Sequence, residues 1–205
     1  FANIEDPKKA AEYIVSLVKE KLPKVYNIRS EDIQVLSPMR KGELGTIYLN
    51  NELQKAVNPT GIEIPHGGTA LRVNDKVMQI VNNYEKDVFN GDVGTLVSID
   101  QEENTFSVNF DGKLVAYKKN EMEELIHAYA TTIHKSQGSE YPIVIMPVTM
   151  GHFIMLQRNL IYTGLTRAKK VIVMVGTKKA LSYAVQNVET YRRNTYLKER
   201  LIKEI

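Results

Sequence analysis

The spacing of apolar residues in the first 60 positions predicts a helix, a strand and a second helix. Asp6 followed by Pro7 is a typical helix start, and apolar residues then recur at helical spacing as far as Pro23. The apolar run Ile33–Ser37 predicts a strand that the next proline ends, and Leu44–Val57 can form the second helix. This order of elements is typical of the start of an α/β sandwich.

From about residue 68 to residue 125 the pattern changes to short runs rich in β-branched and aromatic residues. Turn-forming sequences such as Asn90-Gly91-Asp92 and Asp111-Gly112 separate the runs. Such spacing is typical of a small antiparallel β-barrel. The predicted strands are Lys76–Val81, Val93–Ile99, Thr105–Phe110 and Lys113–Tyr117.

After residue 125 the α/β pattern returns. It predicts strands at Ile126–Thr131, Ile143–Val148 and Val171–Val175, a helix at Leu156–Ala168, and a charged closing helix from Thr190 to Lys203. The predicted fold is therefore an α/β parallel-sheet sandwich with an inserted antiparallel barrel. We place the α/β domain at residues 1–67 and 126–190, the barrel at 68–125 and the charged helix at 191–205.

Composition narrows the class of protein. The 205 residues are 43% hydrophobic, and no apolar run approaches the ~18 residues of a membrane-spanning helix. The chain has no cysteine, which excludes disulfide scaffolds and thiolate zinc sites and agrees with a cytoplasmic location. It begins with Phe1 rather than methionine and has no signal pattern, so we expect it to be cut from a longer protein.

The net charge of +3 is unevenly distributed along the chain. Residues 1–67 are balanced, residues 68–125 carry a net charge of −5, and residues 126–205 carry a net charge of +8. A polyanion would be attracted to the last third and repelled by the barrel. The alternative is that these basic side chains only solvate the outer faces of helices.

Several catalytic signatures are missing from the sequence. It contains no GxxxxGK[ST] phosphate loop, no Asp-Glu pair of the kind that holds magnesium in motor ATPases, and no GxSxG nucleophile elbow. The four histidines show no metal-binding spacing, so we predict no metal site.

The segment Tyr129–Tyr141 places a cluster of polar side chains and a glycine between two apolar strands. Ligands of open α/β sheets bind at the carboxyl ends of strands. Hydroxyl groups and Lys135 can hold phosphate oxygens, and Gly138 allows close backbone approach. The alternative is an ordinary loop rich in turn-forming residues.

Two arginines occupy comparable positions beside predicted strands. Arg167 lies shortly before the strand Val171–Val175, and Arg40 follows the strand Ile33–Ser37. An arginine at a strand edge can stabilise a phosphoryl group, and two of them suggest one shared anion. Arg167 could equally be a helix-end arginine favoured by the helix dipole.

Three segments resemble motifs IV, V and VI of superfamily 1 helicases, and most closely those of the RecD-like branch. They are Ser37-Pro38-Met39-Arg40-Lys41-Gly42, Thr132-Ile133-His134-Lys135-Ser136-Gln137-Gly138-Ser139-Glu140-Tyr141 and Tyr162-Thr163-Gly164-Leu165-Thr166-Arg167-Ala168. In addition, Arg72–Tyr117 is similar to the SH3-like barrel inserted into the second RecA-like motor domain of that family. The resemblance covers about residues 25–180.

The resemblance implies a role for each matching residue. Arg40 and Arg167 would be the catalytic contacts to the terminal phosphate of ATP, and Gly138 and Glu140 would line the nucleotide. Contacts to single-stranded DNA would come from Pro38, Thr132, His134, Lys135 and Ser136. ATP and Mg²⁺ would be cofactors of the complete enzyme, and this chain alone would hold neither.

We therefore expect the carboxy-terminal motor portion of an ATP-dependent 5′–3′ DNA helicase, inactive alone because both Walker motifs are absent. Its partners would be single-stranded DNA and the amino-terminal motor domain, with a further protein contact through the acidic barrel. The alternative is a nucleic-acid-binding or protein-binding module without a motor role, in which the barrel is the working part.

Overall fold

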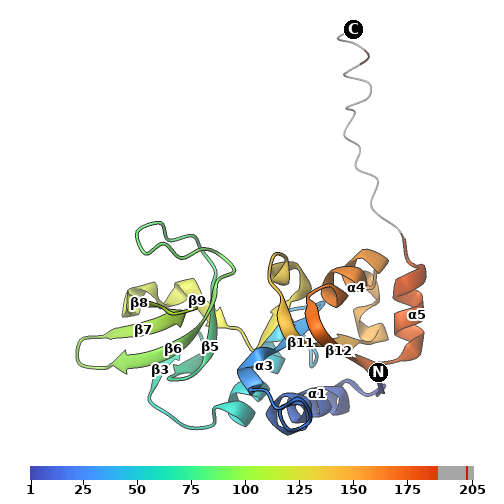
Figure 1. The fold of residues 1–205 in the computed structure, drawn as a ribbon, viewed down its shortest axis with the longest axis horizontal. Coiled ribbons are helices and arrows are strands. Elements are labelled where there is room, and N and C mark those ends of the chain that lie inside the picture. The colour runs from blue at the N-terminus through green and yellow to red at the C-terminus, as the bar shows by residue number, and fades with distance from the viewer. Residues whose placement is uncertain (189–201, 203–205) are drawn as a thin grey trace.

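The computed structural model describes residues 1–188 and 202, and these form two five-stranded β-sheets that lie side by side, together with a two-stranded hairpin (Figure 1). The first sheet has five strands in the order β1-β12-β11-β2-β10, and every neighbouring pair is parallel. Its strands are β1 (Ala2–Asn3), β2 (Ile33–Ser37), β10 (Ala130–Thr132), β11 (Tyr141–Val148) and β12 (Ala168–Gly176).

Helices cover both faces of the parallel sheet. Neighbouring residues of β11 point to opposite faces: Ile143 packs in a cluster with the amino-terminal helices, and Val144 packs with the carboxy-terminal ones. Both faces are buried, which explains the nearly continuous apolar sequence of β11. The helices are α1 (Pro7–Ser16), α2 (Leu22–Tyr26), α3 (Thr46–Val57), α4 (Arg158–Leu165) and α5 (Lys178–Gln186). The predicted RecA-like sandwich is confirmed.

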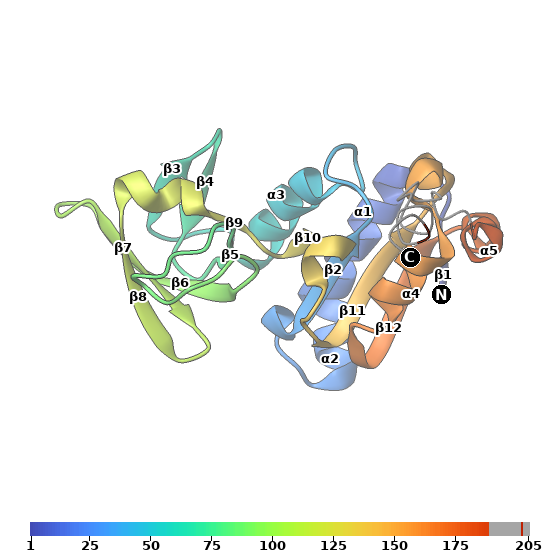
Figure 2. The same ribbon diagram turned by 90° about the horizontal axis from the view of Figure 1, so that it is seen from above.

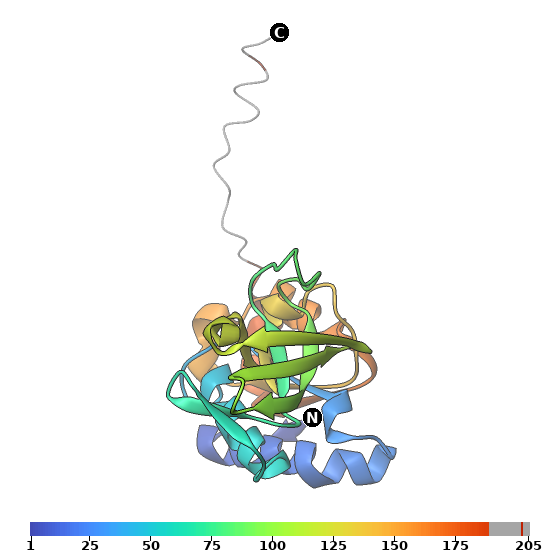
Figure 3. The ribbon, with the colours of Figure 1, turned by 90° about the vertical axis from the view of Figure 1, so that its left-hand side faces the viewer.

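The second sheet is antiparallel, with strands in the order β8-β7-β6-β5-β9. A separate apolar core fills it, and the rings of Phe106 and Tyr117 stack there with centroids 5.2 Å apart. Figure 3 shows this sheet from its outer side. The strands are β5 (Lys76–Gln79), β6 (Val93–Asp100), β7 (Thr105–Phe110), β8 (Lys113–Lys118) and β9 (Leu125–His127). The predicted SH3-like barrel strands are thus present.

Four details differ from the sequence prediction. The predicted strand Ile126–Thr131 is two strands, β9 and β10, that belong to different sheets. The first helical segment continues past Pro23 to Tyr26 through a π-helical turn at Leu17–Lys21, because a proline in the first turn of α2 needs no amide donor. A hairpin of β3 (Glu63–His66) and β4 (Thr69–Arg72), and the helix α5, were not predicted.

The two connections between the sheets differ in length. The chain leaves the parallel sheet through α3 and the β3–β4 hairpin, and it returns directly from β9 to β10 (Figure 2). The hairpin spans the proposed boundary between residues 67 and 68, and the domain boundaries stay a prediction. The predicted helix Thr190–Lys203, proposed as residues 191–205, lies outside the described residues. No helix in the described part of the chain is long and apolar enough to cross a bilayer.

Candidate nucleotide and nucleic-acid interface

The carboxyl edge of the parallel sheet carries the loop that begins at Pro38. Ser37 donates its hydroxyl hydrogen to the carbonyl of Leu44 at 2.6 Å, which closes the loop after β2. The carbonyls of Met39 and Arg40 accept the amides of the first two residues of α3 at 3.0 and 3.1 Å. The loop backbone therefore caps α3 and leaves the Arg40 side chain exposed.

Gly45 is required for this tight loop. A Cβ atom at this position would lie 2.6 Å or less from the carbonyl oxygens of Lys41 and Arg40, which are backbone atoms that cannot move aside. The glycine thus allows the loop to fold back on the start of α3 and fixes the place of Arg40.

The second polar segment begins at the end of β10 on the same edge. Thr132 caps a 3-10 turn over Ile133–Ser136 by accepting the amide of Lys135. The side chains of His134 and Lys135 are exposed and that of Thr132 is half-buried, whereas Ser136 is fully buried and donates its hydroxyl hydrogen to the carbonyl of Ile133 at 2.7 Å. Pro38 is also buried. The accessible members of the predicted DNA-binding set are therefore Thr132, His134 and Lys135.

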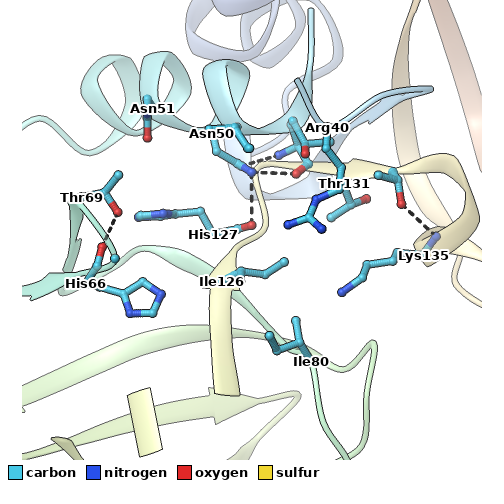
Figure 4. A pocket seen from close by; sticks show the side chains of 15 residues that line it. Arg40, Asn50, Asn51, His66, Thr69, Ile80, Ile126, His127, Thr131 and Lys135 are labelled. Atoms are coloured by element: carbon cyan, nitrogen blue, oxygen red, sulfur yellow. Dashed lines mark hydrogen bonds between the residues drawn. The ribbon is translucent and has the colours of Figure 1, made fainter. Parts of the chain in front are cut away.

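Arg40 and Lys135 share a cavity of about 450 Å³ between the two sheets, which we call the junction cavity (Figure 4). Burial, and then the nearby charge of Arg40, lower the pKa of Lys135. Across the cavity lie His66, Ile80 and Ile126 from the hairpin and the antiparallel sheet. Two cations on one wall and a largely uncharged opposite wall are a suitable arrangement for a phosphodiester strand.

Arg167 lies at the other edge of the sheet, directly before β12. Its guanidinium donates to the carbonyl of Ser139 at 3.0 Å, to the carbonyl of Thr163 at 3.3 Å and to the hydroxyl of Thr166 at 3.2 Å. The Arg167 carbonyl accepts the Tyr141 amide at 2.8 Å. These bonds hold Arg167 against the segment that contains Gly138 and Glu140.

Gly138 and Glu140 are exposed beside Arg167. Gly138 has a φ of +88°, and a Cβ atom there would meet no atom within 4 Å, so the backbone is open to a ligand. A Glu140 carboxylate oxygen lies 3.5 Å from Lys169 Nζ, and both side chains are more than half exposed. Because a guanidinium has five N–H groups, Arg167 retains donors for a further acceptor.

The structure does not bring Arg40 and Arg167 together. Arg167 precedes the residue that pairs with Tyr141, whereas Arg40 follows Ser37, which lies about six residues further along the sheet. At the rise of a parallel strand this is about 20 Å along the sheet. The two arginines thus flank opposite ends of parallel strands, and the prediction of one shared anion stays a prediction that this arrangement does not favour.

Sequence reasoning missed a buried cluster around Asp75, at the junction of the two sheets. Asp75 has no exposed surface. Its carboxylate accepts hydrogen bonds from two side chains of the α3 segment, from a hairpin amide and from two side chains of the crossing between β9 and β10. The donors are Gln54 Nε2 (2.6 Å), Asn58 Nδ2 (2.7 Å), the Arg72 amide (2.7 Å), the Tyr129 hydroxyl (2.9 Å) and His127 Nε2 (3.1 Å).

The electrostatics of Asp75 follow from these donors. Burial raises its pKa, but the hydrogen bonds from His127, Arg72 and Asn58 outweigh burial, and the pKa of Asp75 lies below its usual value. An ionised carboxylate accepts hydrogen bonds only, so His127 carries its hydrogen on Nε2 here. In the sequence, the only sign of this cluster is one acidic residue at the start of an apolar strand. The five groups that donate hydrogen bonds to Asp75 could not be predicted from the sequence.

A second buried contact joins the sheets beside Asp75. Lys76, the first residue of β5, donates to the carbonyls of Glu31 at 2.9 Å and Ile33 at 3.4 Å, at the amino edge of the parallel sheet. Burial lowers the pKa of Lys76 to about 8. The adjacent residues Asp75 and Lys76, at the start of β5, therefore hold the barrel to two parts of the α/β domain.

Two family models match the chain in these regions. Residues 49–110 match the SH3 domain of ATP-dependent RecD-like DNA helicases. Residues 127–175 match the UvrD-like helicase C-terminal domain and include His134, Lys135 and Arg167.

Curated relatives agree with the family models. The chain is 39% identical over 171 residues to the ATP-dependent RecD2 DNA helicase of Deinococcus radiodurans, a match over 82% of this chain. It is 26% identical over 170 residues to the RecD subunit of the RecBCD enzyme of Haemophilus influenzae, over 83% of this chain. The chain spans 23% and 25% of the lengths of these two relatives.

Solved structures share the fold. A Pif1 helicase from Bacteroides, determined with ADP-AlF3 and single-stranded DNA, matches all of this chain and 55% of its own, with a TM-score of 0.55 and 18% identity. A Pif1 structure from a study of forked DNA unwinding matches with a TM-score of 0.52. From the two family models and the curated relatives, the chain belongs to the RecD-like helicases.

Proposed function

We propose that this chain is the carboxy-terminal motor portion of an ATP-dependent DNA helicase, with separate tasks for the two edges of its parallel sheet. The carboxyl edge would hold single-stranded DNA through Arg40, Thr132, His134 and Lys135. The amino edge would face ATP through Arg167, with Gly138 and Glu140 beside the nucleotide. The 5′–3′ direction is proposed from the resemblance to the RecD-like branch.

The observation that supports this proposal is that one short segment joins the two edges of the parallel sheet. Residues 132–141 run from Thr132, at the carboxyl edge, to Tyr141, at the amino edge, where Ser139 accepts a hydrogen bond from Arg167. A movement of Arg167 toward a phosphoryl group would therefore be transmitted along a short chain to Lys135. This link would couple ATP hydrolysis to movement of the strand.

Arg40 receives a different role from the one implied by the family motif. It lies beside Lys135 in the junction cavity and on the opposite edge from Arg167. We propose that Arg40 holds a DNA phosphate rather than the terminal phosphate of ATP. Pro38 and Ser136 would support the DNA site from within, because both are buried.

ATP and Mg²⁺ would be held mainly by the amino-terminal motor domain. This sequence contains neither a phosphate loop nor an Asp-Glu pair. The exposed Gly138 backbone, the Glu140 carboxylate and the free Arg167 donors fit a nucleotide that reaches this edge from a second domain. ATP, when bound there, would supply the phosphoryl chemistry, and Arg167 would stabilise its negative charge.

We expect the 205-residue chain alone to hydrolyse no ATP above background, because it lacks the groups that hold the phosphates and metal. The measurement is phosphate release with single-stranded DNA present, for the wild-type chain and for Arg167→Ala. Reproducible turnover that Arg167→Ala abolishes would contradict the proposed division of work between two motor domains.

We expect the chain to bind single-stranded DNA weakly, with a strong dependence on salt, and Arg40→Ala and Lys135→Ala each to weaken binding further. Each lost phosphate contact should reduce the slope of log K against log salt by about 0.7. Fluorescence anisotropy of a labelled oligonucleotide across a salt series measures both effects.

Lys19→Ala is the matched control for DNA binding, because Lys19 is exposed in the π-helical turn after α1, away from the junction cavity. If Lys19→Ala weakened binding as much as Arg40→Ala and Lys135→Ala did, binding would depend on overall charge, and the proposed strand site would be misplaced.

A further inference from the structure

The loop between β5 and β6 exposes two aromatic side chains next to each other. Tyr84 is 77% exposed and Phe89 is 41% exposed, and their rings pack edge to face with centroids 6.0 Å apart. The loop projects beyond the barrel strands (Figures 1 and 3). A paired aromatic surface in water is unfavourable unless it serves a contact, because each ring presents a large apolar area.

The loop is held in this shape by its own hydrogen bonds and by a buried anchor. Asn83 and Val88 exchange two backbone hydrogen bonds of 2.8 and 3.1 Å, and Val88 is 1% exposed. The Asn83 side-chain amide also donates to Glu124 at 3.3 Å, and Lys86 forms an ion pair with Glu121 at 2.6 Å. The two rings are therefore presented in a fixed arrangement, which reduces the entropy cost of binding a ligand.

The loop starts at the junction cavity. Ile80, the residue after β5, lines that cavity opposite Arg40 and Lys135 (Figure 4). Tyr84 follows four residues later along the same loop. A strand that leaves the cavity along this loop would reach the aromatic pair.

Charge determines which part of a strand can face the barrel. Residues 68–125 carry a net charge of −5, so this side repels phosphates. The rings of Tyr84 and Phe89 need no charge to stack on a base, since every nucleobase has a π-face. Phosphates would thus lie toward Arg40 and Lys135, and bases would turn toward the barrel.

We infer that Tyr84 and Phe89 form a stacking platform for the nucleobases of single-stranded DNA held at the junction cavity. This inference rests on the proposed function, because the strand must first occupy the cavity. The barrel would then contact DNA through the bases. Its negative charge disfavours contact with the phosphates.

A single tryptophan tests the inference directly, because the chain contains none. Tyr84→Trp introduces a fluorophore at the platform, and Tyr26→Trp places one at the exposed end of α2 as a control. Each variant is titrated at low salt with an oligothymidylate and with an abasic strand of equal length and charge. We expect the oligothymidylate to quench the fluorescence of the Tyr84→Trp variant, the abasic strand to quench it little, and neither strand to quench the control.

Affinity provides a second measurement. We expect Tyr84→Ala to weaken oligothymidylate binding about fivefold or more, to leave abasic-strand binding unchanged, and Tyr84→Phe to retain the wild-type affinity for both strands. Lys135→Ala should weaken the binding of both strands, because both carry the same phosphates. Tyr84 is largely exposed, so these variants should fold, and thermal unfolding by circular dichroism checks this.

The outcomes separate the inference from the proposed function. If Lys135→Ala weakens DNA binding but the Tyr84→Trp variant is not quenched and Tyr84→Ala has no effect, the platform is overturned and the DNA site stands. If the wild-type chain binds neither strand at low salt, both the platform and the proposed DNA site are overturned.

Discussion

Arg167→Lys in the complete helicase is expected to lower the DNA-stimulated kcat for ATP hydrolysis by about 10³- to 10⁵-fold. Negative charge grows on the phosphoryl oxygens in the transition state, and a guanidinium can donate two parallel hydrogen bonds to them where an ammonium cannot. Nucleotide affinity should change far less, because the effect belongs to the chemical step. The measurement is kcat at saturating ATP and DNA, together with a separate nucleotide Kd.

Arg158→Lys is the matched control for Arg167→Lys. Arg158 begins α4, the helix that leads to Arg167, and its guanidinium donates to the carbonyl of Val185 at 2.7 Å. It lies at the other end of the helix from the proposed nucleotide site, so its replacement should leave kcat nearly unchanged. An equal loss of kcat in both variants, or none in Arg167→Lys, would contradict the proposed role of Arg167.

Arg40→Ala, measured in the same assay, distinguishes the DNA-binding role proposed for the carboxyl edge from the ATP-binding role proposed for the amino edge. If Arg40 holds a DNA phosphate, the variant should need more DNA for half-maximal stimulation and should keep its kcat at saturating DNA. If both arginines contacted the terminal phosphate, kcat would fall at every DNA concentration. The structure favours the first result, since Arg40 follows the carboxyl end of β2 and Arg167 precedes the amino end of β12.

The parallel sheet could be predicted from the sequence because each of its long strands is a continuous apolar run. Ile143 and Val144 face opposite cores, so both positions must be apolar. The apolar pattern did not predict that β9 and β10 are two separate strands. The run from Leu125 to Thr132 is continuous in sequence, and the chain changes sheets at Ala128 and Tyr129 without a turn residue to mark the change.

The candidate site could be predicted as a set of residues, but its division between two edges could not. Whether Arg40 and Arg167 meet depends on the direction and register of the strands beside them. A sequence motif shows which residue lies before or after a strand. Only the parallel pairing of the strands shows that Arg40 lies at one edge of the sheet and Arg167 at the other. Burial could not be predicted either. Ser136 and Pro38 were predicted as DNA contacts from their place in the motifs, and the structure shows that both are buried.

Asp75→Asn is expected to lower the free energy of unfolding by about 3–5 kcal/mol at pH 7. The substitution keeps the shape of the side chain but replaces one acceptor oxygen by an NH₂ donor, which would face donors such as Gln54 and Asn58, whose nitrogens lie 2.6 and 2.7 Å from the carboxylate. The donors left without an acceptor are buried and cannot turn to water. Chemical denaturation followed by circular dichroism measures the loss.

Two further variants keep this prediction testable. Tyr129→Phe removes one donor to Asp75 and should cost about 1 kcal/mol, so it reports on the cluster even if Asp75→Asn does not fold. Asp87→Asn is the control, because Asp87 is exposed and its ion pair with Lys113 lies in solvent. Its effect should stay within about 0.5 kcal/mol. Equal effects of Asp75→Asn and Asp87→Asn would contradict a structural role for the cluster.

The dependence on pH gives this prediction its sharpest form. The folded-state pKa of Asp75 lies below its usual value of 3.8, so its ionised form stabilises the fold at every pH above that value. This contribution is lost as the pH falls through the folded-state pKa. The difference in unfolding free energy between the wild type and Asp75→Asn should therefore be constant from about pH 5 to pH 7 and shrink below about pH 4. Asp75 joins α3, the hairpin and the β9–β10 crossing. If the difference in unfolding free energy did not shrink in acid, the shape of the side chain, rather than its charge, would hold the barrel to the parallel sheet.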